Sequence, residues 1–175
     1  MSCNIETSPD FNKRKTLHRG PVTVRRARAG DSDYIRGLSK KVFEQYGPYE
    51  SLLVQWFELG ITVTLLALME KHAVGFAMVR RLEHVWSLPR VSELLAIAVE
   101  PAKWRLGIGD LLMDEILREA ERLGVETLVL HTALDNLPAR TLFRKHGFSE
   151  FGMKKKYYPK GQDAIIMYKD ISWRD

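Results

Sequence analysis

The sequence contains a single cysteine, Cys3, among its 175 residues. One cysteine excludes an intrachain disulfide and makes no metal site by itself, so we expect no metal centre. Long hydrophobic runs are also lacking, since the apolar run from Leu94 to Val99 is far too short to cross a membrane. The first residues, MSCNIETSPDFNKRK, lack the apolar segment of a secretory signal. We therefore expect a cytoplasmic protein that does not contact a membrane.

The composition is that of a soluble globular protein, with 45% hydrophobic and 28% charged residues. The net charge of +5 is spread unevenly. Residues 1–28 carry seven Lys/Arg and two acids, residues 29–139 carry 11 and 16, and residues 140–175 carry nine and four. Basic ends suit either nucleic acid or an anionic cofactor. Because residues 1–20 are polar and interrupted by proline and glycine, we expect a flexible basic leader there and a single domain over residues 21–175.

The order of periodic segments predicts a mixed α/β fold. We expect strands at 22–28, 61–69, 73–79, 92–101, 127–132, 148–153 and 164–169, and helices at 34–45, 50–59, 109–123 and 137–146. A loop over residues 84–90 carries Trp86 and Pro89. The segment SELLAIAVEP (residues 92–101) is almost wholly apolar, which predicts a strand buried on both faces. Glu119 is expected on the water-facing side of its helix.

A glycine-bearing loop separates that apolar strand from the next helix. Residues 99–110 read VEPAKWRLGIGD. The first N–H groups of a helix are unpaired and carry partial positive charge, so this junction suits a phosphate. Gly107 and Gly109 lack the Cβ atoms that would hold a pyrophosphate away from the backbone. The loop has neither the Gly-Lys-Ser/Thr of a Walker loop nor the G-x-G-x-x-G of a dinucleotide fold, and a plain tight turn fits its two glycines equally well.

A second motif, further along the chain, indicates which kind of phosphate-binding loop this is. Residues 136–148 read NLPARTLFRKHGF, which matches the pattern N-x-x-A-x-x-L-[FY]-x-x-x-G-F. Together with the V-x-P and x-x-G-x-G elements of the loop, in this order and at this separation, the chain resembles the GNAT superfamily of N-acetyltransferases from Val22 to Asp170. The resemblance implies a central mixed, mostly antiparallel sheet of six to seven strands. The sheet would be splayed between the fourth and fifth strands and flanked by about four helices.

The resemblance also implies acetyl-CoA as co-substrate. In the family, the pantetheine arm hydrogen-bonds to the first of the two splayed strands, a role that falls on Ile97, Ala98 and Val99. Asn136 would help to hold the same arm. The pyrophosphate would lie on the loop backbone, formed here by Arg105, Leu106, Gly107, Ile108, Gly109 and Asp110.

The end of the chain indicates one branch of this superfamily. Residues 156–167 read KYYPKGQDAIIM, which resembles the Y-Y-P…D-A-x-x-M ending of the ribosomal-protein alanine N-acetyltransferases and related protein N-terminal acetyltransferases. By this resemblance, Tyr157 and Tyr158 bind an acceptor peptide, although an aromatic pair that only packs a hairpin end fits the sequence too. Tyr46 and Tyr49 are expected to form a second wall. The acceptor is an amine, either a protein or peptide N-terminus or a small molecule such as a polyamine, amino acid or amino sugar.

Two residues are candidates for the base that deprotonates the acceptor ammonium. Glu93 stands where the histone-acetylating branch has its base glutamate, and its apolar neighbours predict a raised pKa. His131 stands where the ribosomal alanine acetyltransferases have theirs, and an imidazole is a competent base. Either could instead be structural, Glu93 as a surface carboxylate and His131 as a hydrogen-bonded core side chain. We expect Glu93 to be the base because it precedes the strand assigned to pantetheine.

Two departures from the family pattern bear on the chemistry. Trp104 replaces the usual Gln or Arg three residues before the first glycine, so Lys103 or Arg105 is expected to supply the positive charge. Phe143 replaces the tyrosine that reprotonates the CoA thiolate in the ribosomal alanine acetyltransferases. That role is expected to pass to Tyr157 or Tyr158, or to be dispensable because a thiol of pKa about 8.5 leaves readily as thiolate.

Two rival functions fit parts of the sequence. The departures at Trp104 and Phe143 suit an idle GNAT-like module that binds acyl-CoA and regulates a partner. The basic ends and the run KKKYY at residues 154–158 suit a nucleic-acid binder, but the chain has no recognised nucleic-acid motif, so nucleic acid is not expected. The acceptor and the oligomeric state, a homodimer included, stay open at this point.

Overall fold

The computed structural model describes residues 21–80 and 90–171, so the expected leader and the loop with Trp86 and Pro89 lie outside the described residues. Its strands are β1 (Val22–Arg26), β2 (Thr62–Met69), β3 (His72–Arg80), β4 (Val91–Val99), β5 (Thr127–Ala133), β6 (Ser149–Lys154) and β7 (Ala164–Asp170). Its helices are α1 (Ser32–Phe43), α2 (Tyr49–Glu58), α3 (Ile108–Arg122) and α4 (Leu137–Lys145), with the short 3-10 helices η1 (Ala29–Asp31) and η2 (Pro101–Lys103). Every strand and helix expected from the sequence is confirmed within a few residues.

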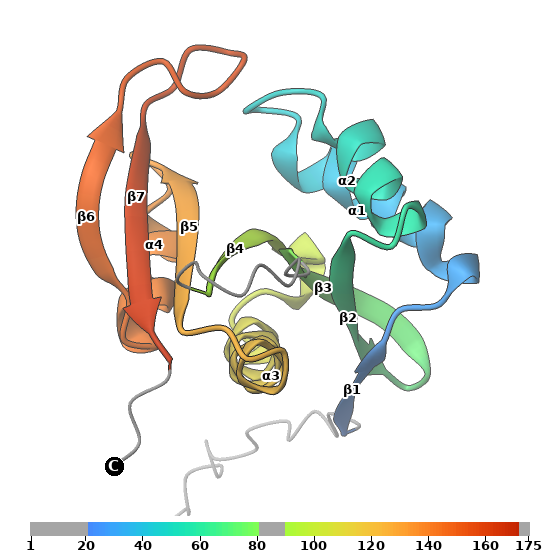
Figure 1. Ribbon diagram of the computed structural model, residues 1–175. Coiled ribbons are helices and arrows are strands. Elements are labelled where there is room, and N and C mark those ends of the chain that lie inside the picture. Colours follow the sequence, from blue (N-terminus) through green and yellow to red (C-terminus); the bar gives the residue numbers. More distant parts are fainter. Residues whose placement is uncertain (1–20, 81–89, 172–175) are drawn as a thin grey trace, which may run out of the picture.

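The seven strands form one sheet in the order β1-β2-β3-β4-β5-β7-β6. Neighbouring strands are antiparallel except β4 and β5, which run parallel. Their pairing covers only Val91–Leu94 against Thr127–Leu130, whereas β4 continues to Val99 and β5 to Ala133. Beyond Leu94 the two strands diverge (Figure 1). The mostly antiparallel sheet, splayed between its fourth and fifth strands, is therefore confirmed.

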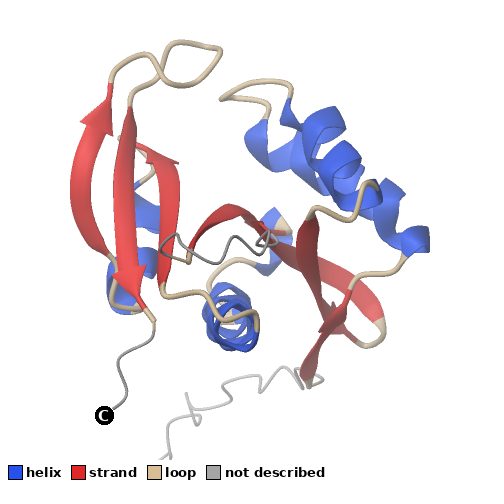
Figure 2. Cartoon of the chain, viewed as in Figure 1, coloured by secondary structure: helices blue, strands red, loops and turns tan. Residues whose placement is uncertain are grey.

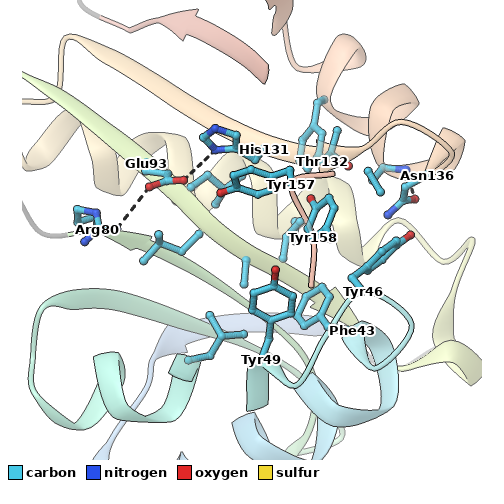
Figure 3. A pocket seen from close by; sticks show the side chains of 18 of the residues that line it. Phe43, Tyr46, Tyr49, Arg80, Glu93, His131, Thr132, Asn136, Tyr157 and Tyr158 are labelled. Carbon is cyan, nitrogen blue, oxygen red and sulfur yellow. Dashed lines mark hydrogen bonds and ion pairs between the residues drawn. The ribbon is translucent and has the colours of Figure 1, made fainter. Parts of the chain in front are cut away.

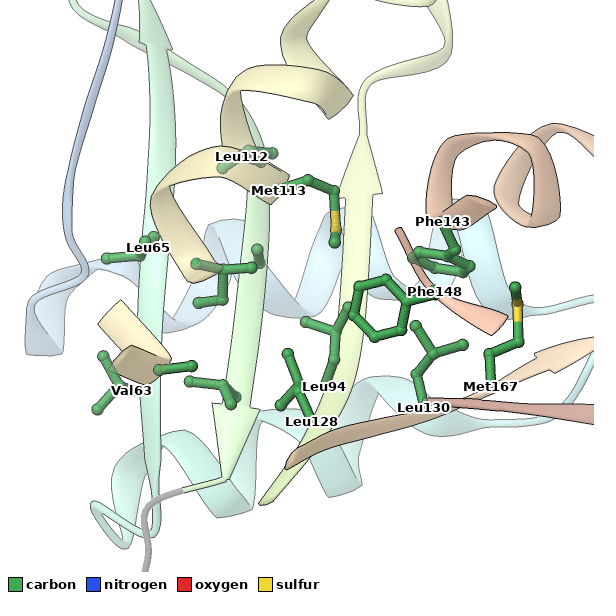
Figure 4. Packing of buried hydrophobic residues seen from close by; sticks show 14 of the residues in the cluster. Val63, Leu65, Leu94, Leu112, Met113, Leu128, Leu130, Phe143, Phe148 and Met167 are labelled. Carbon is green, nitrogen blue, oxygen red and sulfur yellow. The ribbon is translucent and has the colours of Figure 1, made fainter. Parts of the chain in front are cut away.

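Helices cover both faces of the sheet (Figure 2). On one face, α3 and α4 pack their apolar side chains against the strands. Figure 4 shows part of this cluster, in which Leu112 and Met113 of α3 lie with Phe143, Phe148 and Leu94. On the other face, α1 and α2 bury a second cluster that includes Ile35, Leu53, Val54 and Phe76. Each helix is amphipathic at the expected spacing, which is why the layers form where the sequence predicts them.

Two details of burial differ from expectation. Strand β4 contributes to the core on both faces, with Leu94 under α3 and α4 and with Ala96 and Ala98 under α1 and α2, but Glu93 and Ile97 are only half-buried. The reason is the divergence of β5, which leaves one edge of β4 without a neighbouring strand.

Glu119 is the second difference, because it is only 3% exposed rather than facing water. Helical periodicity places Glu119 on the polar side of α3, but Arg26 at the end of β1 reaches across and pairs with it. Arg122, one turn further along α3, pairs with its other carboxylate oxygen at 3.2 Å. A buried carboxylate is tolerated when it is paired in this way.

Candidate active site

A cavity of about 240 Å³ opens where β4 and β5 separate. Its walls come from β4, β5, the α1–α2 connection and the loop between β6 and β7 (Figure 3). Eight of the sequence-predicted residues line it: Glu93, Ile97, His131, Asn136, Tyr46, Tyr49, Tyr157 and Tyr158. Residues from segments far apart in the sequence, predicted separately as base, cofactor contact and acceptor wall, therefore meet in one place.

Four tyrosines form one side of the cavity. Tyr158 lies at the centre, with its ring centroid 5.1 Å from that of Tyr46 and 6.2 Å from that of Tyr49. Tyr157 packs edge-on against Tyr158 at 5.1 Å. Burial raises the pKa of each phenol above its usual value, most strongly for Tyr158. All four hydroxyls are therefore protonated near neutral pH and can donate hydrogen bonds.

Hydrogen bonds join the two tyrosine loops, which are the α1–α2 connection with Tyr46 and the β6–β7 loop with Tyr157 and Tyr158. The N–H of Lys160 donates to the carbonyl of Tyr46 at 3.3 Å, and Gln162 Nε2 donates to the carbonyl of Gln45 at 2.6 Å. Gly47, at φ +156°, lies against the Pro159 ring, where an added Cβ would come within 2.8 Å of Pro159 Cγ. The close approach of the two loops thus depends on a glycine at this position.

Glu93 and His131 form a hydrogen-bonded pair on the opposite side. Glu93 Oε1 lies 3.0 Å from His131 Nδ1, and Glu93 Oε2 lies 3.4 Å from the Arg80 guanidinium (Figure 3). The hydrogen bond from His131, helped by Arg80, holds the pKa of Glu93 below its usual value even though burial opposes this. The raised pKa expected for Glu93 is therefore wrong. Its apolar neighbours are outweighed by two polar partners that the sequence did not reveal.

The second nitrogen of His131 faces a lysine. Lys154 Nζ lies 3.1 Å from His131 Nε2 and 5.3 Å from the centre of the Tyr157 ring. The Tyr157 ring stacks on the imidazole at 4.7 Å with an interplanar angle of 5°. Because a lysine ammonium only donates, this arrangement fits the tautomer in which Nδ1–H donates to Glu93 and Nε2 keeps its lone pair. The imidazole is thus held in position by three neighbours.

The open edge of β4 lies beside this pair. The N–H of Glu100 donates to the carbonyl of Val74 on β3, and backbone groups of alternate residues in a strand point in opposite directions. Ile97 and Val99 therefore direct their N–H and C=O groups away from β3, whereas Ala98 directs its groups toward it. The carbonyl of Val99 already accepts a hydrogen bond from Trp104 Nε1 at 2.8 Å. Of the three residues predicted to contact pantetheine, Ile97 has the freest backbone.

The glycine loop ends at the N-terminus of α3. Gly107 is the N-cap at φ +77°, a conformation that favours glycine, and no side chain caps the helix. An added Cβ at Gly107 would meet no atom within 4 Å, so the backbone is open to a ligand. Arg105 also has a positive φ, of 64°, whereas Ile108 is buried in the core. The first N–H groups of α3, including that of Gly109, are thus presented at an uncapped helix start.

Asp110, the last predicted residue of the loop, points toward α4. Its carboxylate lies 2.7 Å from Lys145 Nζ and 3.0 Å from His146 Nε2. The hydrogen bond from Lys145, followed by that from His146, lowers its pKa despite some burial. Only the backbone N–H of Asp110 remains suited to an anionic ligand, because the carboxylate itself would repel one.

The second motif positions two cavity residues. Asn136 Oδ1 caps α4 by accepting from the N–H of Ala139 at 3.2 Å, which leaves its amide nitrogen at the cavity. Phe143 is 4% exposed, and its ring lies 6.0 Å from that of Phe148. Phe143 also lines the cavity, so its ring faces the same space and offers no hydroxyl there.

Three residues at this site were not singled out from the sequence. Arg80 and Trp56 line the cavity, with the Arg80 guanidinium 5.5 Å from the centre of the Trp56 ring. No local motif marks either of them. Lys154 belongs to the basic run that we interpreted as a feature of nucleic-acid binders. Its position at the end of β6, across β7 from β5, brings Lys154 to His131, and the sequence carries no signal for that strand order.

No helix over residues 21–80 and 90–171 is long and apolar enough to cross a membrane. Within the same residues, no group of three or more His, Cys, Asp or Glu side chains is arranged to hold a metal ion.

Comparisons with known proteins agree on one family. Residues 32–148 match the model of the acetyltransferase (GNAT) family. An N-alpha-acetyltransferase of Sulfolobus acidocaldarius is 28% identical over 151 residues, covering 82% of this chain and 89% of that protein. The ribosomal protein bS18-alanine N-acetyltransferase of Salmonella typhimurium is 40% identical over 82 residues, covering 45% of this chain and 55% of that protein.

A solved structure supports the fold. The structure of an acetyltransferase from Salmonella typhimurium with its cofactor acetyl-CoA superposes with a TM-score of 0.74 at 18% identity, covering 87% of this chain and 95% of that one. At this identity the likeness concerns the fold alone.

Proposed function

The chain belongs to the acetyltransferase (GNAT) family, and from this we propose that it transfers an acetyl group from acetyl-CoA to the α-amine of a protein or peptide N-terminus. N-acetylation by acetyl-CoA is the activity of the family. The choice of an α-amine as acceptor goes beyond the general activity of the family. One observation supports it, the wall of four tyrosines from two linked loops. Hydroxyl donors on an aromatic surface suit the carbonyl groups and side chains of a peptide. The N-alpha-acetyltransferase relatives support the same acceptor.

The residues present fit acetyl-CoA. Pantetheine carries amide groups, and the unpaired edge of β4 at Ile97 offers an N–H and a C=O to them. The pyrophosphate is anionic, and the open backbone at Gly107 and the first N–H groups of α3 suit an anion. Lys103 and Arg105 lie in the same loop and would add positive charge. When bound, acetyl-CoA supplies a thioester whose carbonyl carbon an amine can attack.

Glu93 and His131 act together in this proposal rather than as alternatives. His131 Nε2, which keeps its lone pair in this tautomer, takes the proton from the acceptor ammonium directly or through water. Glu93 fixes the tautomer through Nδ1–H and stabilises the imidazolium that forms, because its low pKa keeps it ionised. Arg80 holds Glu93 in turn. An α-amine, with a pKa of about 8 against about 10.4 for a lysine side chain, needs little further help.

The proposed acceptor predicts a clear preference. A peptide with a free α-amine should be acetylated up to roughly 10²-fold faster near neutral pH than the same peptide with a blocked terminus and a free lysine. The reason is that about 10²-fold more of the α-amine is neutral at that pH. CoA release with the two peptides, and mass spectrometry of the products, would measure it.

The same assay should include polyamines, free amino acids and amino sugars at matched concentrations. Equal rates for the two peptides, or a preference for lysine or for any small amine, would overturn the N-terminal acceptor. The transferase activity itself would stand in that case, since every one of these reactions releases CoA.

We propose that Tyr157 returns a proton to the leaving thiolate. Its hydroxyl stays protonated because burial, and then the charge of Glu93, raise its pKa. Tyr157→Phe keeps the ring that stacks on His131 and removes only the hydroxyl. We expect turnover to fall by roughly tenfold, less than the 10²–10⁴-fold typical of a general acid, because a thiolate leaves readily.

Steady-state kinetics of Tyr157→Phe beside Tyr158→Phe would test this assignment. The Tyr157 variant should lose turnover with unchanged acetyl-CoA affinity, whereas the Tyr158 variant should mainly raise the KM for the peptide. Full turnover in Tyr157→Phe would remove Tyr157 from the chemistry.

A further inference from the structure

One primary amine already lies beside the proposed base, and it belongs to the protein. Lys154 ends β6, and its Nζ lies 3.1 Å from His131 Nε2. A base must come within about 2.6–3.2 Å of the group whose proton it removes, and Lys154 Nζ meets that distance. The acceptor amine of the proposed reaction would have to approach the same nitrogen.

The neighbours of Lys154 also favour a held side chain rather than a freely moving one. Its ammonium lies 5.3 Å from the centre of the Tyr157 ring, and this ring is stacked on His131. A lysine over a tyrosine face is attracted to the ring. Lys155 and Lys156 follow directly in the chain, but neither contacts His131 or Tyr157 in any hydrogen bond or cation–π contact of the described structure.

We propose that Lys154 is a self-acetylation site, at which this enzyme acetylates its own side chain from bound acetyl-CoA. The proposal rests on the proposed function for its acetyl donor. His131 Nε2 removes one proton from the Lys154 ammonium, and the neutral Nζ forms a bond to the acetyl carbon. The carbon–sulfur bond breaks, and sulfur leaves with its electron pair. The extra proton on nitrogen is lost to solvent, and the thiolate takes up a proton, so the products are Nε-acetyl-Lys154 and CoA.

Acetylation of Lys154 would change how the site receives its acceptor. The unmodified ammonium occupies the lone pair of His131 and repels a second ammonium that approaches the same nitrogen. The acetylated side chain has no charge and no longer competes for the proton on an acceptor. The modified enzyme would therefore bind a cationic acceptor more readily than the unmodified one.

The test is incubation of the full chain with isotopically labelled acetyl-CoA and no acceptor, followed by intact-mass measurement and peptide mapping. We expect one acetyl group, located at Lys154, to appear at a rate that does not depend on protein concentration. His131→Ala should slow this labelling by roughly 10²-fold, the low end of a general-base contribution. Lys154→Arg keeps the positive charge and should take up no label at this position, while Lys155→Arg serves as the matched control and should label normally.

Labelling spread evenly over residues 154, 155 and 156, or labelling of Lys154 that His131→Ala leaves unchanged, would show simple chemical acetylation and overturn the proposal. No label at Lys154 would also overturn it, and the thermal shift with acetyl-CoA separates the two ways in which this can happen. A protein that is stabilised by acetyl-CoA and acetylates peptides but not itself refutes self-acetylation alone. A protein that acetyl-CoA does not stabilise refutes the proposed function, and self-acetylation with it.

Discussion

His131→Ala is expected to lower turnover of a peptide acceptor by roughly 10²–10⁴-fold, the usual size of a lost general base. The acetyl-CoA affinity should hardly change, because the loop at Gly107 and the edge at Ile97 are untouched. Steady-state kinetics with saturating acetyl-CoA would measure the loss. Because the variant lacks the proposed base, the fall of turnover on the acid side should largely disappear.

Glu93→Gln is the matched variant for the same experiment. A glutamine oxygen can still accept from His131 Nδ1, so the imidazole keeps its orientation, but the charge that stabilises the imidazolium is gone. We therefore expect a smaller loss than in His131→Ala and an acid limb that persists. If Glu93→Gln loses more turnover and the acid limb, and His131→Ala is nearly normal, Glu93 is the base, as the sequence first indicated.

The second large effect is expected at the glycine loop. Gly109→Glu places a carboxylate in the first turn of α3, where the pyrophosphate would lie, and should abolish stabilisation by acetyl-CoA. In the parent protein, acetyl-CoA at 100 times its Kd should add about 2.7 kcal/mol to the free energy of unfolding. For a chain of this size that raises the Tm by about 5–10 °C, which differential scanning fluorimetry resolves easily.

Gly109 suits this test better than Gly107. Gly107 has a φ of +77°, so any side chain there strains the backbone, whereas at Gly109 an added Cβ would only reach ordinary contact with Leu142, at 3.4 Å. A glutamate in the first turn also stabilises a helix, so the variant should fold without acetyl-CoA. Gly109→Gln has the same size without the charge and should keep most of the shift. A full shift in Gly109→Glu would mean that the phosphates lie elsewhere.

The fold could be predicted well because its signals are local. The short apolar, β-branched runs of β2 and β3, the periodicity of α3 and the glycines that end helices are all visible in short windows of sequence. The splay between β4 and β5 has no such local signal. We expected it only because residues 99–110 and 136–148 resemble the motifs of a family with a splayed sheet. Nothing in the composition of SELLAIAVEP says that its edge loses a neighbour after Leu94.

The chemistry at the site could be predicted only in part. Glu93 and His131 were weighed as rivals because they are 38 residues apart and sequence spacing gives no distance between them. The register that pairs Glu93 with Val129 places His131 two residues further along β5, on the same face, and so joins them. Arg80 and Lys154 come from strands that carry no motif, so their contacts could not be predicted. Arg80, together with His131, lowers the pKa of Glu93, whereas the apolar neighbours of Glu93 had predicted a raised pKa.

The short parallel ladder has a mechanical consequence. Strands β1 to β4 form one half of the described sheet and β5 to β7 the other, and four residue pairs join their backbones. Backbone pairing between the two halves is therefore confined to the base of the cavity, and the α1–α2 connection and the β6–β7 loop meet across its mouth. A chain of amides laid along β4 would brace the two halves against each other. Opening of the mouth, which release of CoA and of product requires, would then be slowest while the donor is bound and fastest once it has left.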